Sequence, residues 1–128
     1  RWPVRMIVVL LTAASAFAQG GNWLHYQGNQ EGHRYSPLAQ ITKANAARIK
    51  PAWVYQIDKL DKFEASPIVR DGIMYISEPP SDVTALETRS GKVLWKYKRQ
   101  LPDGLPFCCG RVNRGVGILG DLIFIGTL

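Results

Sequence analysis

A strand–turn–strand pattern that occurs twice is the feature that most constrains this sequence. Residues 67–77 contain two short apolar strands joined by an Asp-Gly turn, which is a strong hairpin signal. The same order returns at residues 118–125, where Leu122 stands 49 residues after Ile73. A repeat of about 40–50 residues, each unit holding about four short strands, is typical of a β-propeller. The sequence therefore predicts an all-β chain built from propeller blades.

A second hairpin is predicted inside the first repeat. Alternating residues at 83–87 and 93–97 flank a polar turn, with the spacing Ala85-x-Glu87-x-x-Ser90-Gly91-x-x-x-Trp95. Pairing of these strands brings Trp95 beside the strand of Ala85, where its ring can cover a small side chain and its N–H can reach backbone. Blades can dock in this way. A single buried hairpin with an aromatic plug is the alternative, and the residues alone do not separate the two.

The part of the chain before the repeats reads as an extended arm at residues 19–51, rich in glycine, aromatic and polar residues. Thr42 is a possible N-cap, alanines follow it and Pro51 ends the run, which predicts one short helix near 42–49. Residues 52–57 alternate apolar and polar side chains and are expected to form a strand.

The N-terminus has the pattern of a secretory signal peptide. Arg1 and Arg5 precede an apolar run at residues 6–14, which is too short to span a bilayer. The small-x-small pattern of residues 16–18 follows this run. We expect cleavage after residue 18, against the alternatives of an uncut anchor or a buried helix. Export would place the protein in an oxidising compartment, with no stable membrane span after cleavage.

Composition and spacing exclude some classes of function. The 128 residues are 46% hydrophobic and 20% charged, which is typical of a globular protein of one domain at most. The net charge is +6, but after the signal peptide the basic residues scatter from Arg34 to Arg114 without a basic run, so nucleic acid is not an expected partner. His25 and His33 lack a second ligand at a spacing that recurs in metal sites, so neither is expected to bind a metal or act as a base.

Both cysteines of the chain are adjacent, at Cys108 and Cys109. Neighbouring Cα atoms lie about 3.8 Å apart, below the usual span of a disulfide, so a bond between them would close a small strained ring that gains little from loop closure. Such a ring would be a flat, polarisable surface near Arg111 and Arg114, which suits a planar anionic ligand. Reduced, buried cysteines are the alternative.

Several of these stretches together resemble the start of a PQQ-dependent alcohol dehydrogenase, a quinoprotein family with an eight-bladed β-propeller. The resemblance covers essentially all of the chain after the signal peptide, and it implies that residues 52–128 are the first blade and part of the second. The tryptophan motif is shared by many propellers, whereas adjacent cysteines followed by Val-Asn-Arg-Gly are specific to the cofactor-dependent branch. The matching stretches are Tyr26-x-Gly28, Gly32-His33-Arg34-Tyr35-Ser36-Pro37-Leu38, Ala52-Trp53-x-Tyr55, Glu64-Ala65-Ser66-Pro67, the Ala85-to-Trp95 motif, and Cys108-Cys109-x-x-Val112-Asn113-Arg114-Gly115.

The resemblance implies roles for four residues. Cys108 and Cys109 would form a disulfide ring against one face of the pyrroloquinoline quinone (PQQ), and Arg114 and Glu64 would contact its polar rim. A guanidinium can bind this tricarboxylate through charge-assisted, bidentate hydrogen bonds. A glutamate facing an anion must accept from a ring N–H or be held by a nearby cation. The alternatives are a solvated strand end for Glu64 and a surface or inter-blade ion pair for Arg114.

For the complete protein, the resemblance implies alcohol oxidation in the periplasm. A calcium or lanthanide ion would polarise the quinone carbonyl, an aspartate would take the alcohol proton, and a periplasmic cytochrome c would accept the electrons. In the family, the metal ligands and this aspartate lie well downstream, so the chain is expected to be an N-terminal fragment that is inactive alone. The alternatives are a non-catalytic tryptophan-motif propeller scaffold, which has no need of the paired cysteines, and a sugar-oxidising quinoprotein, which normally has several membrane spans before the propeller.

Overall fold

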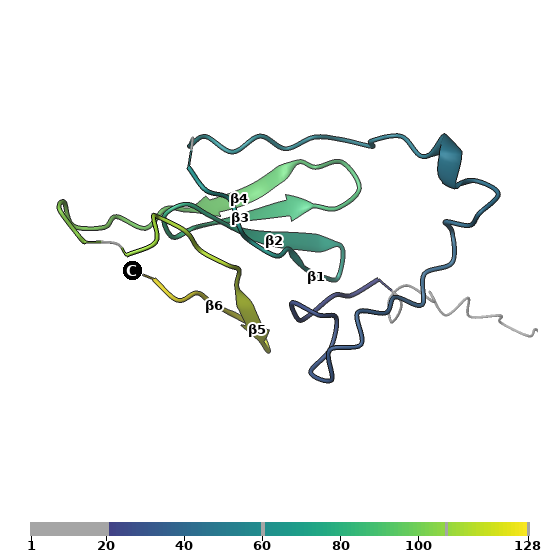
Figure 1. The fold of residues 1–128 in the computed structure, drawn as a ribbon, viewed down its shortest axis with the longest axis horizontal. Helices are drawn as coiled ribbons and strands as arrows, with labels where there is room; N and C mark the ends of the chain where they lie inside the picture. The colour runs from purple at the N-terminus through teal and green to yellow at the C-terminus, as the bar shows by residue number, and fades with distance from the viewer. Residues whose placement is uncertain (1–20, 60, 107, 128) are drawn as a thin grey trace, which may run out of the picture.

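The computed structural model describes residues 21–59, 61–106 and 108–127, so the predicted signal peptide lies outside the described residues. Strands β1 (Ile68–Arg70), β2 (Ile73–Glu78), β3 (Asp82–Glu87) and β4 (Val93–Tyr97) form one antiparallel sheet in sequence order. Strands β5 (Gly117–Leu119) and β6 (Leu122–Phe124) form a second, two-stranded sheet (Figure 1). This arrangement confirms the all-β prediction of one four-stranded blade followed by the start of another. Within the described residues, no helix is long and apolar enough to cross a membrane.

The register of the first sheet confirms the predicted position of the tryptophan. Ala85 on β3 is paired with Trp95 on β4 and, on its other side, with Tyr75 on β2. The Tyr75 and Trp95 rings lie 6.0 Å apart in a tilted arrangement, above an alanine that is fully buried. A small side chain at the centre of the sheet thus leaves room for two aromatic side chains to meet across it.

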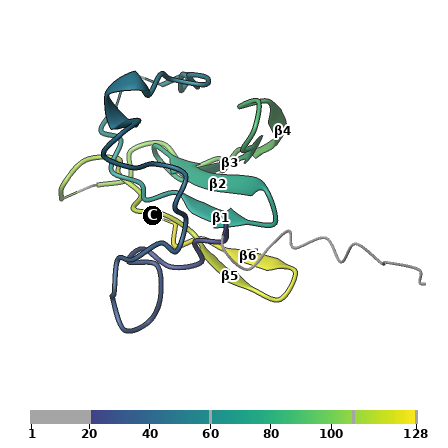
Figure 2. The same ribbon diagram turned by 90° about the vertical axis from the view of Figure 1, so that its right-hand side faces the viewer.

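A hydrophobic cluster lies between the two sheets. Ile68 of β1, Val83 of β3 and Val116, just before β5, are its buried members, and partly buried side chains of both sheets pack around them. Figure 2 shows β5 and β6 beside β1, at one edge of the twisted first sheet. The core therefore joins one blade to the beginning of the next.

The strand predicted at 52–57 is wrong, although the alternation has a physical cause. Trp53 and Tyr55 are partly buried while Val54 is 86% exposed, so the segment presents one side to the blade without joining a ladder. Its contacts are made by side chains: Trp53 Nε1 donates to the Thr88 carbonyl at 2.9 Å, and the Tyr55 hydroxyl donates to Glu78 at 2.7 Å. Side-chain anchoring replaces backbone pairing here.

Two ion pairs hold the next two residues, Asp58 and Lys59, against the blade. Lys59 Nζ lies 2.8 Å from the carboxylate of Asp82, whose side chain is only 8% exposed, and Asp58 pairs with Lys96 at 3.0 Å. The hydrogen bond and charge of Lys96 lower the pKa of Asp58, and Tyr55 and Asp58 raise the pKa of Lys96. The chain is therefore tied to the blade just before it enters the residues of the candidate site.

The predicted helix near 42–49 is reduced to a single 3-10 turn, η1 (Ala46–Arg48). The Asn45 side chain accepts from the Thr42 backbone N–H at 2.7 Å and donates to the Gln40 carbonyl at 2.7 Å. An asparagine that bonds neighbouring backbone groups in this way competes with helical hydrogen bonds. Thr42 therefore does not begin a helix.

The turn between β3 and β4 supplies a test of this packing. Gly91 has φ +70°, and a Cβ there would lie 2.5 Å from the Trp53 ring. Gly91→Ala should cost about 1–2 kcal/mol for the left-handed backbone and a further 1–3 kcal/mol, roughly, for overpacking against the indole. The measurement is urea unfolding of the complete protein.

Gly104 provides the matched control, because it has φ +74° but nothing within 4 Å of an added Cβ. Gly104→Ala should show the backbone cost alone. Equal losses of stability in the two variants would contradict the close packing of Trp53 on Gly91.

Candidate functional site

Glu64 and Arg114 come together although they lie in different repeats. Glu64 precedes β1, Arg114 precedes β5, and their charged groups form an ion pair at 3.4 Å. The backbones meet as well, since the Ser66 N–H donates to the Arg114 carbonyl at 3.2 Å. The sequence left two possibilities for Glu64, a ring N–H or a nearby cation, and it left an inter-blade ion pair as the alternative for Arg114. The observed ion pair supplies the cation for Glu64 and is that inter-blade contact. The role of the two residues toward PQQ stays a prediction.

The Val-Asn-Arg-Gly stretch is shaped by its asparagine and glycine. Asn113 donates through Nδ2 to the Gly126 carbonyl at 2.7 Å, and its Oδ1 accepts from the Gly115 N–H at 3.1 Å. Gly115 has φ +137°, and a Cβ there would lie 3.2 Å from the Ser66 carbonyl oxygen. A glycine at this position therefore permits the close approach of the two strand-entry loops, and Asn113 ties the loop to the chain that follows β6.

The cysteine pair borders a cavity of about 500 Å³. Both cysteines are exposed thiols whose sulfurs lie 2.7 Å apart, in hydrogen-bonding contact, so the expected disulfide stays a prediction. The lining combines apolar surface, two sulfurs and one guanidinium; it is made by Leu105, Pro106, Cys108, Cys109, Gly110, Val112 and Arg114. Such a lining suits one face of a flat ring with an anionic rim.

The thiol of Cys109 experiences opposing electrostatic effects. The hydrogen bond with the Cys108 thiol, followed by desolvation, raises the pKa of Cys109 above the usual range of a thiol. The positive charges of Arg114 and Lys62 act in the opposite direction, and the carboxylate of Glu64 acts with the hydrogen bond. Reduced Cys109 is therefore held as a neutral thiol at neutral pH.

Lys62 is a residue of this site that the sequence did not single out. Its ammonium group lies 3.5 Å from the Cys109 carbonyl oxygen, and its stem passes beside Gly110. Its spacing from Glu64 was the signal that could have identified it. Side chains two residues apart in an extended segment lie on the same side, and Lys62 stands two residues before Glu64.

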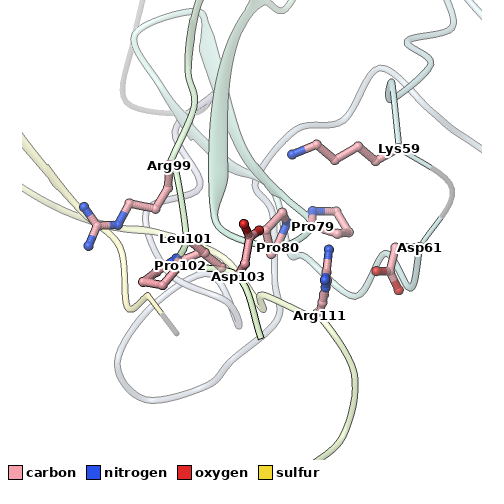
Figure 3. A pocket seen from close by; sticks show the side chains of 9 residues that line it. All are labelled: Lys59, Asp61, Pro79, Pro80, Arg99, Leu101, Pro102, Asp103 and Arg111. Atoms are coloured by element: carbon pink, nitrogen blue, oxygen red, sulfur yellow. The ribbon is translucent and has the colours of Figure 1, made fainter. Parts of the chain in front are cut away.

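Arg111 does not line the cavity beside the cysteine pair. It lines a separate cavity of about 420 Å³ together with Lys59, Pro79, Pro80 and Asp103 (Figure 3). Sequence analysis placed Arg111 near the cysteine ring together with Arg114, and the family resemblance assigned a cofactor contact only to Arg114. Arg114 lines the cavity beside the cysteines, and Arg111 lines the second cavity. The two arginines of this loop therefore contribute to different cavities.

The histidines lie in the N-terminal arm. The side chain of His33 makes a 2.8 Å hydrogen bond with that of Asn29, and the His33 backbone N–H donates to the same asparagine. Among the described residues, no group of three or more His, Cys, Asp or Glu side chains could hold a metal ion.

Comparison with known proteins identifies the class of the fold and then the family. The domain model described as "PQQ: Glucose/ethanol/alcohol dehydrogenase, beta-propeller domain" matches residues 23–121. Because this match covers most of the chain, the protein belongs to the PQQ β-propeller dehydrogenase family.

Individual relatives agree with this assignment. The chain is 44% identical to the 1-butanol dehydrogenase (cytochrome c) of Thauera butanivorans over 93% of its own length and 18% of that protein. It superposes on quinohemoprotein alcohol dehydrogenase of Comamonas testosteroni with a TM-score of 0.78 at 37% identity, covering 86% of this chain and 17% of that one. A europium-containing methanol dehydrogenase gives a TM-score of 0.77 at 30% identity, covering 86% and 20%. The chain thus spans about a fifth of the length of these relatives.

Thiol titration tests the electrostatics of this site. In the reduced complete protein, alkylation of Cys109 should reach half its maximal rate at a higher pH than for an ordinary cysteine, because a raised pKa delays thiolate formation. Cys108→Ala should move this midpoint to lower pH, and Arg114→Gln should move it to higher pH. Peptide mapping of the alkylated protein at successive pH values measures both shifts.

Arg89, which is exposed in the turn between β3 and β4, provides the control. Arg89→Gln removes the same charge and should leave the midpoint unchanged. A midpoint that stays in place in Cys108→Ala would show that the neighbouring thiol does not govern Cys109.

Proposed function

We propose that this chain forms one wall of the PQQ site in a dehydrogenase that oxidises alcohols. The observation that carries the proposal is the convergence of Cys108, Cys109, Arg114 and Glu64, which come from the entries to two successive blades, around one cavity and one ion pair. Membership of the PQQ family and the names of the relatives support the same cofactor and an alcohol substrate.

The residues fit the chemistry of PQQ. The cysteine pair offers a polarisable surface on which a flat ring can lie, and Val112 extends it with an apolar side chain. Arg114 has a side chain that is 78% exposed, and its guanidinium can bind a carboxylate in a bidentate way. Glu64 orients that guanidinium and can accept a hydrogen bond from a ring N–H. When bound, PQQ supplies the electron acceptor for oxidation of the alcohol.

The remaining components of the reaction belong to the complete protein. We infer a calcium or lanthanide ion bound by residues outside this chain, and the europium-containing relative supports a metal of this kind. A cytochrome c is the proposed electron acceptor, in line with the name of the Thauera relative. The chain alone is proposed to be inactive, because it spans only 18% of that relative and supplies one wall of the site.

Reconstitution of the complete apoprotein tests the proposal. PQQ with Ca²⁺, or with a lanthanide ion, should restore dye-linked oxidation of primary alcohols. In Cys108→Ala/Cys109→Ala we expect PQQ to bind about three- to tenfold more weakly, the loss typical of one stacking surface. Titration by fluorescence quenching measures this affinity separately from turnover. Full affinity in the double variant would remove the cysteine pair from the site, and a wild-type protein that binds no PQQ would refute the proposed function.

Export is a second part of the proposal that can be tested directly. If residues 1–18 are a cleaved signal peptide, the mature protein recovered from the periplasm should begin at Gln19. N-terminal sequencing of the periplasmic fraction provides the measurement, and Ala18→Arg should block processing and leave the longer form. A protein that keeps residues 1–18 would contradict cleavage.

A further inference from the structure

The side chain of Lys62 lies against the cysteine pair without a carboxylate partner among the described residues. Its ammonium donates a long hydrogen bond of 3.5 Å to the Cys109 carbonyl oxygen. An added Cβ at Gly110 would lie 3.7–3.9 Å from the end of the Lys62 side chain, so the lysine stem covers this glycine. The neighbouring Asp61 carboxylate accepts from the Lys62 backbone N–H at 2.8 Å instead of from its ammonium group.

The charges of the site show what Lys62 adds. Arg114 and Glu64 form an ion pair at 3.4 Å, so their formal charges cancel. A rim that must hold a planar polycarboxylate needs a net positive charge, because an ion pair already satisfied within the protein attracts a distant anion only weakly. Lys62 restores a net charge of +1 to this group of three residues, with its ammonium close to the backbone of Cys109.

We propose that Lys62 is a further cofactor-binding residue of this site, whose ammonium binds a carboxylate of the planar anion lying on Cys108 and Cys109. The inference rests on the proposed function, since it assigns a partner to the same ligand. A lysine suits the role because its flexible four-carbon stem lets the ammonium leave a weak carbonyl contact for a stronger carboxylate one. The 3.5 Å distance from the Lys62 ammonium to the Cys109 carbonyl oxygen places the charge beside the cysteine pair.

The test is the affinity of the complete apoprotein for PQQ, measured by fluorescence quenching at low and high salt. Lys62→Gln should weaken binding roughly three- to tenfold at low ionic strength, and less at high salt where charge interactions are screened. Lys62→Glu should weaken it further, and Lys62→Arg should restore most of the affinity. Lys92, which is exposed just before β4, provides the matched control through Lys92→Gln.

The outcomes separate this inference from the proposed function. Loss of affinity in Lys62→Gln, with Lys92→Gln unchanged, supports the role of Lys62. Wild-type affinity in Lys62→Gln together with loss in Arg114→Gln overturns the Lys62 role and leaves the PQQ site intact. Equal loss in the Lys62 and Lys92 variants assigns the effect to overall charge and also overturns it, and a wild-type protein that binds no PQQ overturns both proposals.

Discussion

The packing of one sheet on the next is the interaction on which the candidate site depends. Ile68, Val83 and Val116 are buried between the sheets and place the entrances of β1 and β5 side by side. Glu64 stands four residues before β1, and Arg114 stands three residues before β5. The loops that enter successive repeats thus meet, because a propeller places every blade in the same orientation.

The end of the loop between β4 and β5 is held by contacts with two other parts of the chain. Asn113 ties it to Gly126, and Gly115 allows the backbone of the loop to reach Ser66. These contacts hold the main chain of Arg114 while its guanidinium stays exposed. When the backbone is already held in place, less conformational entropy is lost as a ligand binds to the exposed charged group. A pre-formed binding surface is expected to have this property.

Sequence patterns predicted the structure correctly where it depends on neighbouring residues or on the repeated hairpins. The Asp71-Gly72 turn and the pairing of Ala85 with Trp95 follow from alternation and turn chemistry, and the structure contains both. The patterns failed at 52–57 and 42–49. The alternation of apolar and polar residues at 52–57 shows only that one side of the segment is buried. The side-chain hydrogen bonds of Trp53 and Tyr55 bury that side without any strand pairing. At 42–49, the side-chain hydrogen bonds of Asn45 outweigh a modest helix propensity.

By itself, the sequence determined the all-β repeat, the adjacency of the two cysteines and the family, because each is a matter of residue order and spacing. The tertiary structure alone decided that Glu64 is neutralised by Arg114, that Arg111 faces a separate cavity, and that Lys62 covers Gly110 beside Cys109. These facts depend on contacts between residues that are far apart in the sequence. Such contacts arise only when one sheet is packed on the next, and no local pattern of side chains encodes which charges will then meet.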